Sequence, residues 1–133
     1  MAKAYYAKAI AADPKNAGAY YHLGYVEEVS GNLKDAMAAY EKAAELNPAN
    51  PEVQYNLGNV YWALSLQQKA EEKYQEAVKL KPSHKDAWVN LSILSYDTGN
   101  YQQAAQYFDK AVALGYQIPP AYQQKLAEYR QRR

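Results

Sequence analysis

The sequence predicts an all-α protein built from stacked antiparallel helix pairs, and two observations support this fold class. Helix-forming Ala, Gln, Glu, Lys and Leu dominate the 133 residues, whereas β-branched residues are few. In addition, small and aromatic residues recur along the chain with a period of 34, which indicates that one structural unit is repeated. We therefore expect a solenoid of about eight helices.

The repeat is defined by positions at which every unit carries the same kind of residue. One position holds a small residue, the position before it holds leucine, and three others hold an aromatic ring or alanine. In chain order these sets are Gly24, Gly58 and Ser92; Leu23, Leu57 and Leu91; Ala36, Ala70 and Ala104; Tyr40, Tyr74 and Phe108; and Ala43, Ala77 and Ala111. A glycine inside a helix costs about 1 kcal/mol relative to alanine. We therefore expect Gly24 to permit a close approach to Tyr40 on the facing helix.

Each unit divides into two expected helices joined by a short turn. The expected helices cover 2–12, 17–30, 34–46, 51–64, 67–80, 85–98 and 101–114, with a last helix near the C-terminus. Gly31-Asn32 is a turn signal, and Pro48 and Pro82 end the second helices because a residue before proline avoids the α conformation. The predicted organisation is a half unit (1–16), three units (17–50, 51–84 and 85–118) and a capping helix (119–133).

This pattern resembles the tetratricopeptide repeat over nearly the whole chain. The first unit supplies the family's characteristic residues as Tyr20, Leu23, Gly24, Gly31, Ala36, Tyr40, Ala43 and Pro48. The units depart from the family pattern at Glu27, Gln54, Ser65, Ser92, Ser95 and Tyr116. In particular, Glu27 stands where the family usually has an aromatic residue. The resemblance implies a right-handed α-solenoid that serves as a binding module without catalysis. In such a module the first helix of each unit lines a concave groove.

The resemblance also predicts which side chains line that groove. These peptide-binding candidates are Tyr21, Tyr25, Glu28, Glu52, Tyr55, Asn59, Trp62, Asp86, Val89, Ile93, Tyr96 and Asp97. Aromatic rings bury a large area at little rotamer cost, and carboxylates favour a positively charged partner. We therefore expect a protein or peptide segment with basic and apolar residues to bind there.

Two purely structural interpretations of these residues stay open. The first is that some tyrosines only pack between neighbouring units, and Tyr20, Tyr40, Tyr61 and Tyr74 are expected in the core. The second is that the carboxylates form a solvated face without a ligand. Trp62 is the stronger binding candidate, because Tyr61 already supplies the core aromatic residue of that turn.

The leading half unit supports a second functional hypothesis, which is self-association. Segment 2–12 carries Tyr5, Tyr6 and Ile10 but lacks the helix that would precede it in a complete unit. Its uncovered apolar side can pair with a second copy, giving a homo-oligomer through exposed or exchanged terminal helices. A fragment of a longer repeat protein would show the same half unit, so both interpretations stay open.

Other function classes find little support in the sequence. The net charge of +1 gives no pull toward nucleic acid or membrane, and Arg130, Arg132 and Arg133 are a weak phosphate signal. The chain has no cysteine, and His22 and His84 belong to no catalytic or metal-binding motif. We therefore expect no enzyme activity, no metal and no cofactor.

The family's chaperone-binding members hold a C-terminal carboxylate with Lys and Asn side chains of the first two units and with basic residues of the third. The corresponding positions here hold Tyr21, Tyr25, Asn56, Asp86 and Asn90, of which only Asn56 matches. A heat-shock chaperone tail is therefore not expected as the ligand. No apolar run approaches the roughly 18 residues of a membrane span, and no signal peptide is evident. A soluble protein, cytoplasmic by default, is expected.

Overall fold

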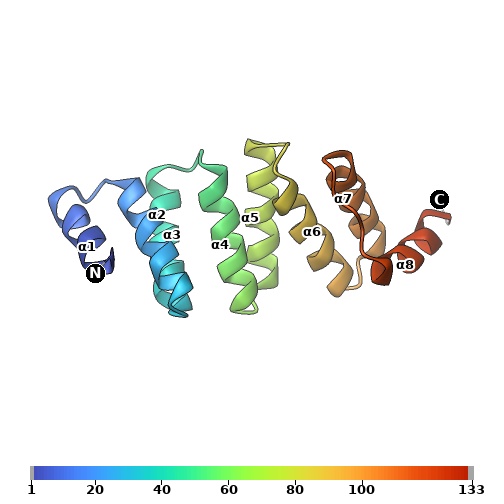
Figure 1. The fold of residues 1–133 in the computed structure, drawn as a ribbon, viewed down its shortest axis with the longest axis horizontal. Coiled ribbons are helices and arrows are strands. Elements are labelled where there is room, and N and C mark those ends of the chain that lie inside the picture. Colours follow the sequence, from blue (N-terminus) through green and yellow to red (C-terminus); the bar gives the residue numbers. More distant parts are fainter. Residues whose placement is uncertain (1, 132–133) are drawn as a thin grey trace.

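The computed structural model describes residues 2–131, with side chains to Tyr129, and this range contains eight α-helices and no strand (Figure 1). The helices are α1 (Ala2–Ala12), α2 (Ala17–Val29), α3 (Leu33–Leu46), α4 (Pro51–Ala63), α5 (Gln67–Leu80), α6 (Lys85–Asp97), α7 (Tyr101–Ala113) and α8 (Pro120–Gln131). The side chains of Arg130, Arg132 and Arg133, considered above as phosphate contacts, lie outside the described part.

The helices stand in one row from the N-terminus to the C-terminus (Figure 1). The most extensive contacts join α2 to α3, α4 to α5 and α6 to α7, and smaller contacts join each pair to the next. This is the predicted all-α solenoid of antiparallel helix pairs. The helices of the three pairs begin and end within one residue of the positions expected from the sequence.

Equivalent side chains cap the first helix of each pair. Asn16 and Asn50 accept hydrogen bonds from the backbone N–H groups of Ala19 and Glu52 at 3.0 Å each. His84 stands at the same position of the third unit, and its Nδ1 accepts from the N–H of Ala87 at 3.1 Å. A side-chain acceptor at this position satisfies a donor that the helix itself leaves unpaired.

The helix-interior glycines lie directly against buried tyrosine rings. A Cβ atom at Gly24 would lie 2.6 Å from Cδ1 of Tyr40, and one at Gly58 would lie 2.8 Å from Cε1 of Tyr74. Both rings are fully buried. The repeated small residue is therefore explained by the close approach of the paired helices, as the sequence predicts.

A serine replaces glycine at one turn without changing the turn's conformation. Gly31 and Gly99 both have φ of 84°, and Ser65, which joins α4 to α5, has φ of 63°. The left-handed region is unfavourable for residues with a side chain. Ser65 therefore adopts the strained conformation that the repeat requires at this point.

The core runs along the interior of the helix row. Tyr40, Tyr61 and Tyr74 are buried there as predicted, together with the repeated alanines and with Leu57 and Leu91. The prediction for Tyr20 was wrong, because this ring is only half-buried. It lines an open cleft between α1 and the α2–α3 pair. Of the described helices, none is long and apolar enough to cross a membrane.

Candidate binding face on helices α2, α4 and α6

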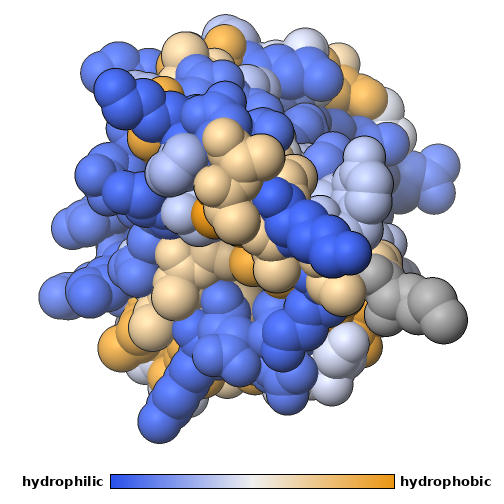
Figure 2. All heavy atoms as spheres, turned by 90° about the vertical axis from the view of Figure 1, so that its left-hand side faces the viewer, coloured by the Kyte–Doolittle hydropathy of each residue, from blue (hydrophilic) through white to orange (hydrophobic). Residues whose placement is uncertain are grey.

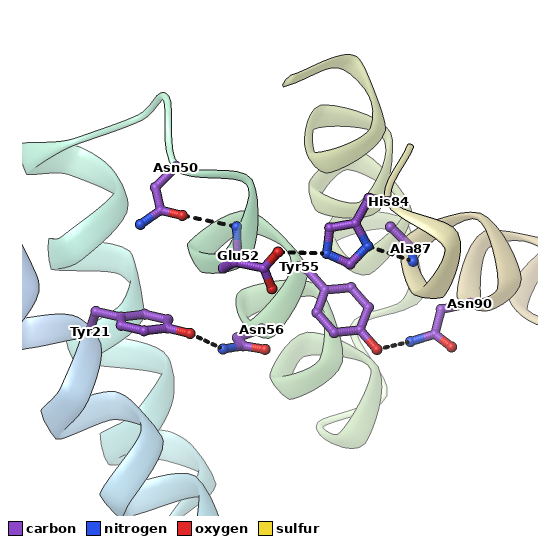
Figure 3. Close-up of polar contacts among 8 residues, drawn as sticks. All are labelled: Tyr21, Asn50, Glu52, Tyr55, Asn56, His84, Ala87 and Asn90. Atoms are coloured by element: carbon purple, nitrogen blue, oxygen red, sulfur yellow. Dashed lines mark hydrogen bonds and ion pairs between the residues drawn. The ribbon is translucent and has the colours of Figure 1, made fainter. Parts of the chain in front are cut away.

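The predicted binding residues lie on the first helices of the three pairs, and we call this surface the groove face. Two hydrogen bonds with the same geometry join its successive helices (Figure 3). Asn56 Nδ2 on α4 donates to the hydroxyl of Tyr21 on α2 at 3.1 Å. Asn90 Nδ2 on α6 donates to the hydroxyl of Tyr55 on α4 at 3.3 Å. These bonds fix the positions of the two tyrosine side chains on the groove face.

Tyr40 on α3 and Tyr74 on α5 form hydrogen bonds to residues of the groove face. Their rings fill the core, while the Tyr40 hydroxyl donates to Glu28 Oε1 at 2.8 Å and the Tyr74 hydroxyl donates to Asn59 Oδ1. Asn90 Nδ2 also donates to Asn59 Oδ1 at 2.9 Å. Burial raises the pKa of both tyrosines, and at Tyr40 the hydrogen bond to Glu28 raises it further. Both hydroxyls therefore stay protonated donors at neutral pH.

The tyrosine–asparagine pairs that join successive first helices keep unused hydrogen-bonding groups. Tyr21 and Tyr55 accept hydrogen bonds from asparagine, and no acceptor for their own hydroxyl protons is found among residues 2–129. Likewise, no donor within that range reaches the side-chain oxygens of Asn56 and Asn90. Each interface between first helices therefore offers a free tyrosine hydroxyl donor and a free asparagine oxygen acceptor.

Burial and charge differ among the predicted residues. Tyr25 is 56% exposed, and Asp86 and Asp97 are also exposed. Tyr21, Glu28, Glu52, Tyr55, Asn59, Trp62 and Val89 are half-buried. The structure brings Tyr21 close to two carboxylates. Its pKa is raised chiefly by burial, the hydrogen bond from Asn56 lowers it, and the charges of Glu52 and Glu28 raise it. The first two units thus gather rings and carboxylates together.

The third unit presents less free surface than the sequence suggests. The Tyr96 ring packs edge-on against Tyr122 of α8, with centroids 4.7 Å apart, and against Tyr101 at 5.0 Å. Ile93 packs against the same small core near α8. Both predicted binding residues are therefore partly covered by the C-terminal helices, and the accessible aromatic surface is concentrated on α2 and α4.

His84 is a site residue that sequence reasoning missed. It is buried, and its ring centroid lies 4.7 Å from that of Tyr55 (Figure 3). Because Nδ1 accepts the capping bond, the neutral ring carries its proton on Nε2, which lies 3.1 Å from Glu52 Oε1. The atoms are at ion-pair distance without an aligned hydrogen bond. A sequence signal for the capping role was available, because His84 follows Asn16 and Asn50 at the 34-residue spacing of the repeat.

The side chains of the groove face are suited to binding. Within the described residues, no group of three His, Cys, Asp or Glu side chains is placed to hold a metal ion. His84 lies beside the groove-face carboxylate of Glu52, and its Nδ1 is already used by the α6 cap. The groove face therefore provides rings, amides and carboxylates for contact with another molecule.

Comparison with known families gives one extensive match. A family model described as the TPR domain of cytochrome c-type biogenesis protein H matches residues 7–124, which is most of the chain. Among curated proteins, none matches the sequence.

Several solved structures share the fold. MamA superposes with a TM-score of 0.80 at 25% identity, covering 83% of this chain and 64% of MamA. YrrB, described as a TPR protein with an unusual peptide-binding site, gives 0.75 at 24% identity over 83% of this chain and 57% of YrrB. The first TPR of Spaghetti (RPAP3), bound to the HSP90 peptide SRMEEVD, gives 0.75 at 20% identity, covering 90% of this chain and 94% of that chain. The chain therefore spans less than two thirds of the MamA and YrrB chains.

Proposed function

The chain belongs to the tetratricopeptide repeat family, a family of protein-interaction modules, and from that premise we propose that its groove face captures an extended protein segment. The proposed segment carries basic and apolar side chains. The observation that carries this proposal is the repeated pair of unused groups, a tyrosine hydroxyl proton and an asparagine oxygen, at both interfaces between first helices.

An extended main chain fits those groups chemically. Each of its residues carries one N–H donor and one C=O acceptor. The hydroxyls of Tyr21 and Tyr55 can donate to its carbonyl groups, and the oxygens of Asn56 and Asn90 can accept from its N–H groups. Because these groups recur at successive units, they can bind a peptide main chain along the groove face whatever its sequence.

Side-chain preference would come from the rings and carboxylates. Tyr25 and Trp62 offer apolar surface on α2 and α4, and Glu28 and Glu52 lie on the same helices. Neither α2 nor α4 contains Lys or Arg. A Lys- or Arg-bearing segment is therefore favoured over an acidic one. The proposal excludes the acidic tail of a heat-shock chaperone as the ligand.

A fluorescence titration tests this proposal. The chain has two tryptophans, so a Trp88→Phe variant leaves Trp62 as the only indole reporter. Peptides selected from a random display library should change its emission and should be enriched in Lys or Arg next to apolar residues. Tyr25→Ala with Trp62→Ala should abolish binding, measured by calorimetry, whereas Val112→Ala, an exposed site on α7, should not. Undiminished binding by the double variant would refute the proposal.

A second candidate function, self-association through α1, is favoured by one observation. No residue of α1 is buried, and Tyr5 is 69% exposed. The N-terminal end of the molecule shows a strip of apolar surface between hydrophilic side chains (Figure 2). Tyr6 and Ile10 are half-buried, and the Tyr6 ring stacks on His22 at 5.4 Å, so Tyr5 is the main free anchor.

Light scattering over a wide concentration range tests self-association. The proposal expects a dimer or larger species that Tyr5→Glu converts to a monomer, whereas the neighbouring surface change Lys8→Ala leaves it intact. A monomer at every concentration would eliminate this candidate and leave the groove face as the functional surface.

A further inference from the structure

A separate cleft of about 350 Å³ lies between α1, α2 and α3. Its apolar wall is formed by Tyr20, Leu23 and Ala39, and its polar groups include Glu27, Asp35 and Lys3. None of these residues belongs to the groove face. The volume is within the range of clefts that bind small ligand groups.

In this cleft, Glu27 stands where the second unit has an aromatic residue. The second unit has Tyr61 at the equivalent position, where the ring is buried and its hydroxyl donates to Glu41 at 2.6 Å. Glu27 is also buried, with 3% of its surface exposed, although its side chain carries a carboxylate. A buried carboxylate is costly unless a cation or hydrogen-bond donors compensate its charge.

The compensating cation comes from a weakly held part of the chain. Lys3 Nζ lies 3.3 Å from Glu27 Oε1, but the Lys3 side chain is 61% exposed. It sits near the start of α1, a helix with no buried residue. Lys3 can leave the carboxylate when another cation takes its place, because its own partly exposed ion pair contributes little stability.

We propose that this cleft is a binding site for the charged end of an arginine or lysine side chain from a partner protein, and that Lys3 occupies it in the free chain. Glu27 and Asp35 together outweigh the single ammonium of Lys3, so the cleft keeps negative charge for an incoming cation. Tyr20, Leu23 and Ala39 suit the methylene stem of such a side chain. A guanidinium can also bind a carboxylate through two parallel hydrogen bonds.

The test follows the methyl resonances of Leu23 and Ala39 by NMR during titration with n-butylguanidinium. We expect saturable shifts at these methyl groups and none with n-butylurea, a neutral molecule of the same shape. Lys3→Gln should tighten binding by about three- to fivefold, the factor that corresponds to a partly exposed ion pair. Lys8→Gln, which changes a lysine on the same helix outside the cleft, should have no effect.

Two further arms make the result decisive. Glu27→Gln, shown to be folded by circular dichroism, should abolish the shifts. The blocked tripeptide acetyl-Ala-Arg-Ala-amide should compete with n-butylguanidinium, and its failure to do so would overturn the assignment to a protein side chain. Absence of saturable shifts in the Lys3→Gln protein, or an equal response to n-butylurea, would overturn the site itself. The groove-face proposal is unaffected by either outcome because the two surfaces share no residue.

Discussion

The ring of Tyr40 occupies the space that a side chain at position 24 would need, since a Cβ atom there would lie 2.6 Å from Cδ1. The ring is fully buried and its hydroxyl is bound to Glu28, so it has little freedom to move away. The contact thus links the packing of α2 on α3 to a residue of the groove face.

Replacing Gly24 by alanine should therefore destabilise the protein. Overpacking against Tyr40 outweighs the better helix propensity of alanine and leaves a net loss of up to about 2 kcal/mol in the free energy of unfolding. Urea denaturation measures this loss. Gly18→Ala is the matched control, because a Cβ there meets only Asn16 Oδ1 at 3.5 Å and should not destabilise. Equal stability of the Gly24→Ala protein would contradict the close-packing explanation.

A second prediction concerns the caps that recur every 34 residues. His84→Ala removes the acceptor for the Ala87 N–H and should lower the free energy of unfolding by about 1 kcal/mol or more, because the ring contact with Tyr55 is lost as well. His84→Asn should keep most of the stability, since asparagine caps α2 and α4 at the equivalent positions. Comparing the thermal unfolding of the two variants separates the contribution of the capping hydrogen bond from that of the imidazole ring. If His84→Asn were as damaging as His84→Ala, the capping role would be refuted.

The buried tyrosines predict how stability depends on alkaline pH. Burial raises the pKa of Tyr74 in the folded chain above its usual value of 10.0. The folded state therefore holds this proton where the unfolded state releases it. Its contribution to stability is complete below pH 10 and is lost as the pH rises above that value.

Tyr74→Phe isolates this contribution. Above pH 10 the free energy of unfolding of the unchanged protein should fall more steeply with pH than that of the variant, by up to about 1.4 kcal/mol per pH unit. Urea titrations at a series of pH values from 9 upward measure both slopes. Parallel slopes would show that Tyr74 titrates alike in the folded and unfolded states.

The repeat pattern predicts the fold well because packing in this solenoid is local. Each helix rests mainly on its neighbours in the chain, so Gly24, Tyr40 and their equivalents at 34-residue spacing carry most of the information. Proline and glycine mark the helix ends through backbone preferences that need no tertiary context. This explains why the helix bounds observed for the three pairs agree with the expected bounds within one residue.

The side-chain contacts of the site were harder to predict. The Tyr21–Asn56 and Tyr55–Asn90 bonds depend on how far one unit is rotated against the next, which periodicity does not give. The partial cover of Tyr96 depends on where α8 turns after the last pair. Each of these features requires a contact between elements whose relative placement is set by the whole stack of helices.

The last prediction uses the acidic peptide SRMEEVD, which the similar TPR of RPAP3 binds. Here Asp86 replaces a basic residue of the family's carboxylate-binding set, and α2 and α4 carry no Lys or Arg. Like charges should therefore prevent binding, and calorimetry at low salt should detect none. A control peptide with the three acidic residues changed to lysine and an amidated C-terminus, SRMKKVK, should bind. Its affinity should weaken as salt is added, because screening reduces attraction between partly exposed charges. Binding of SRMEEVD, or an affinity for SRMKKVK that is insensitive to salt, would show that the groove-face carboxylates do not select the ligand.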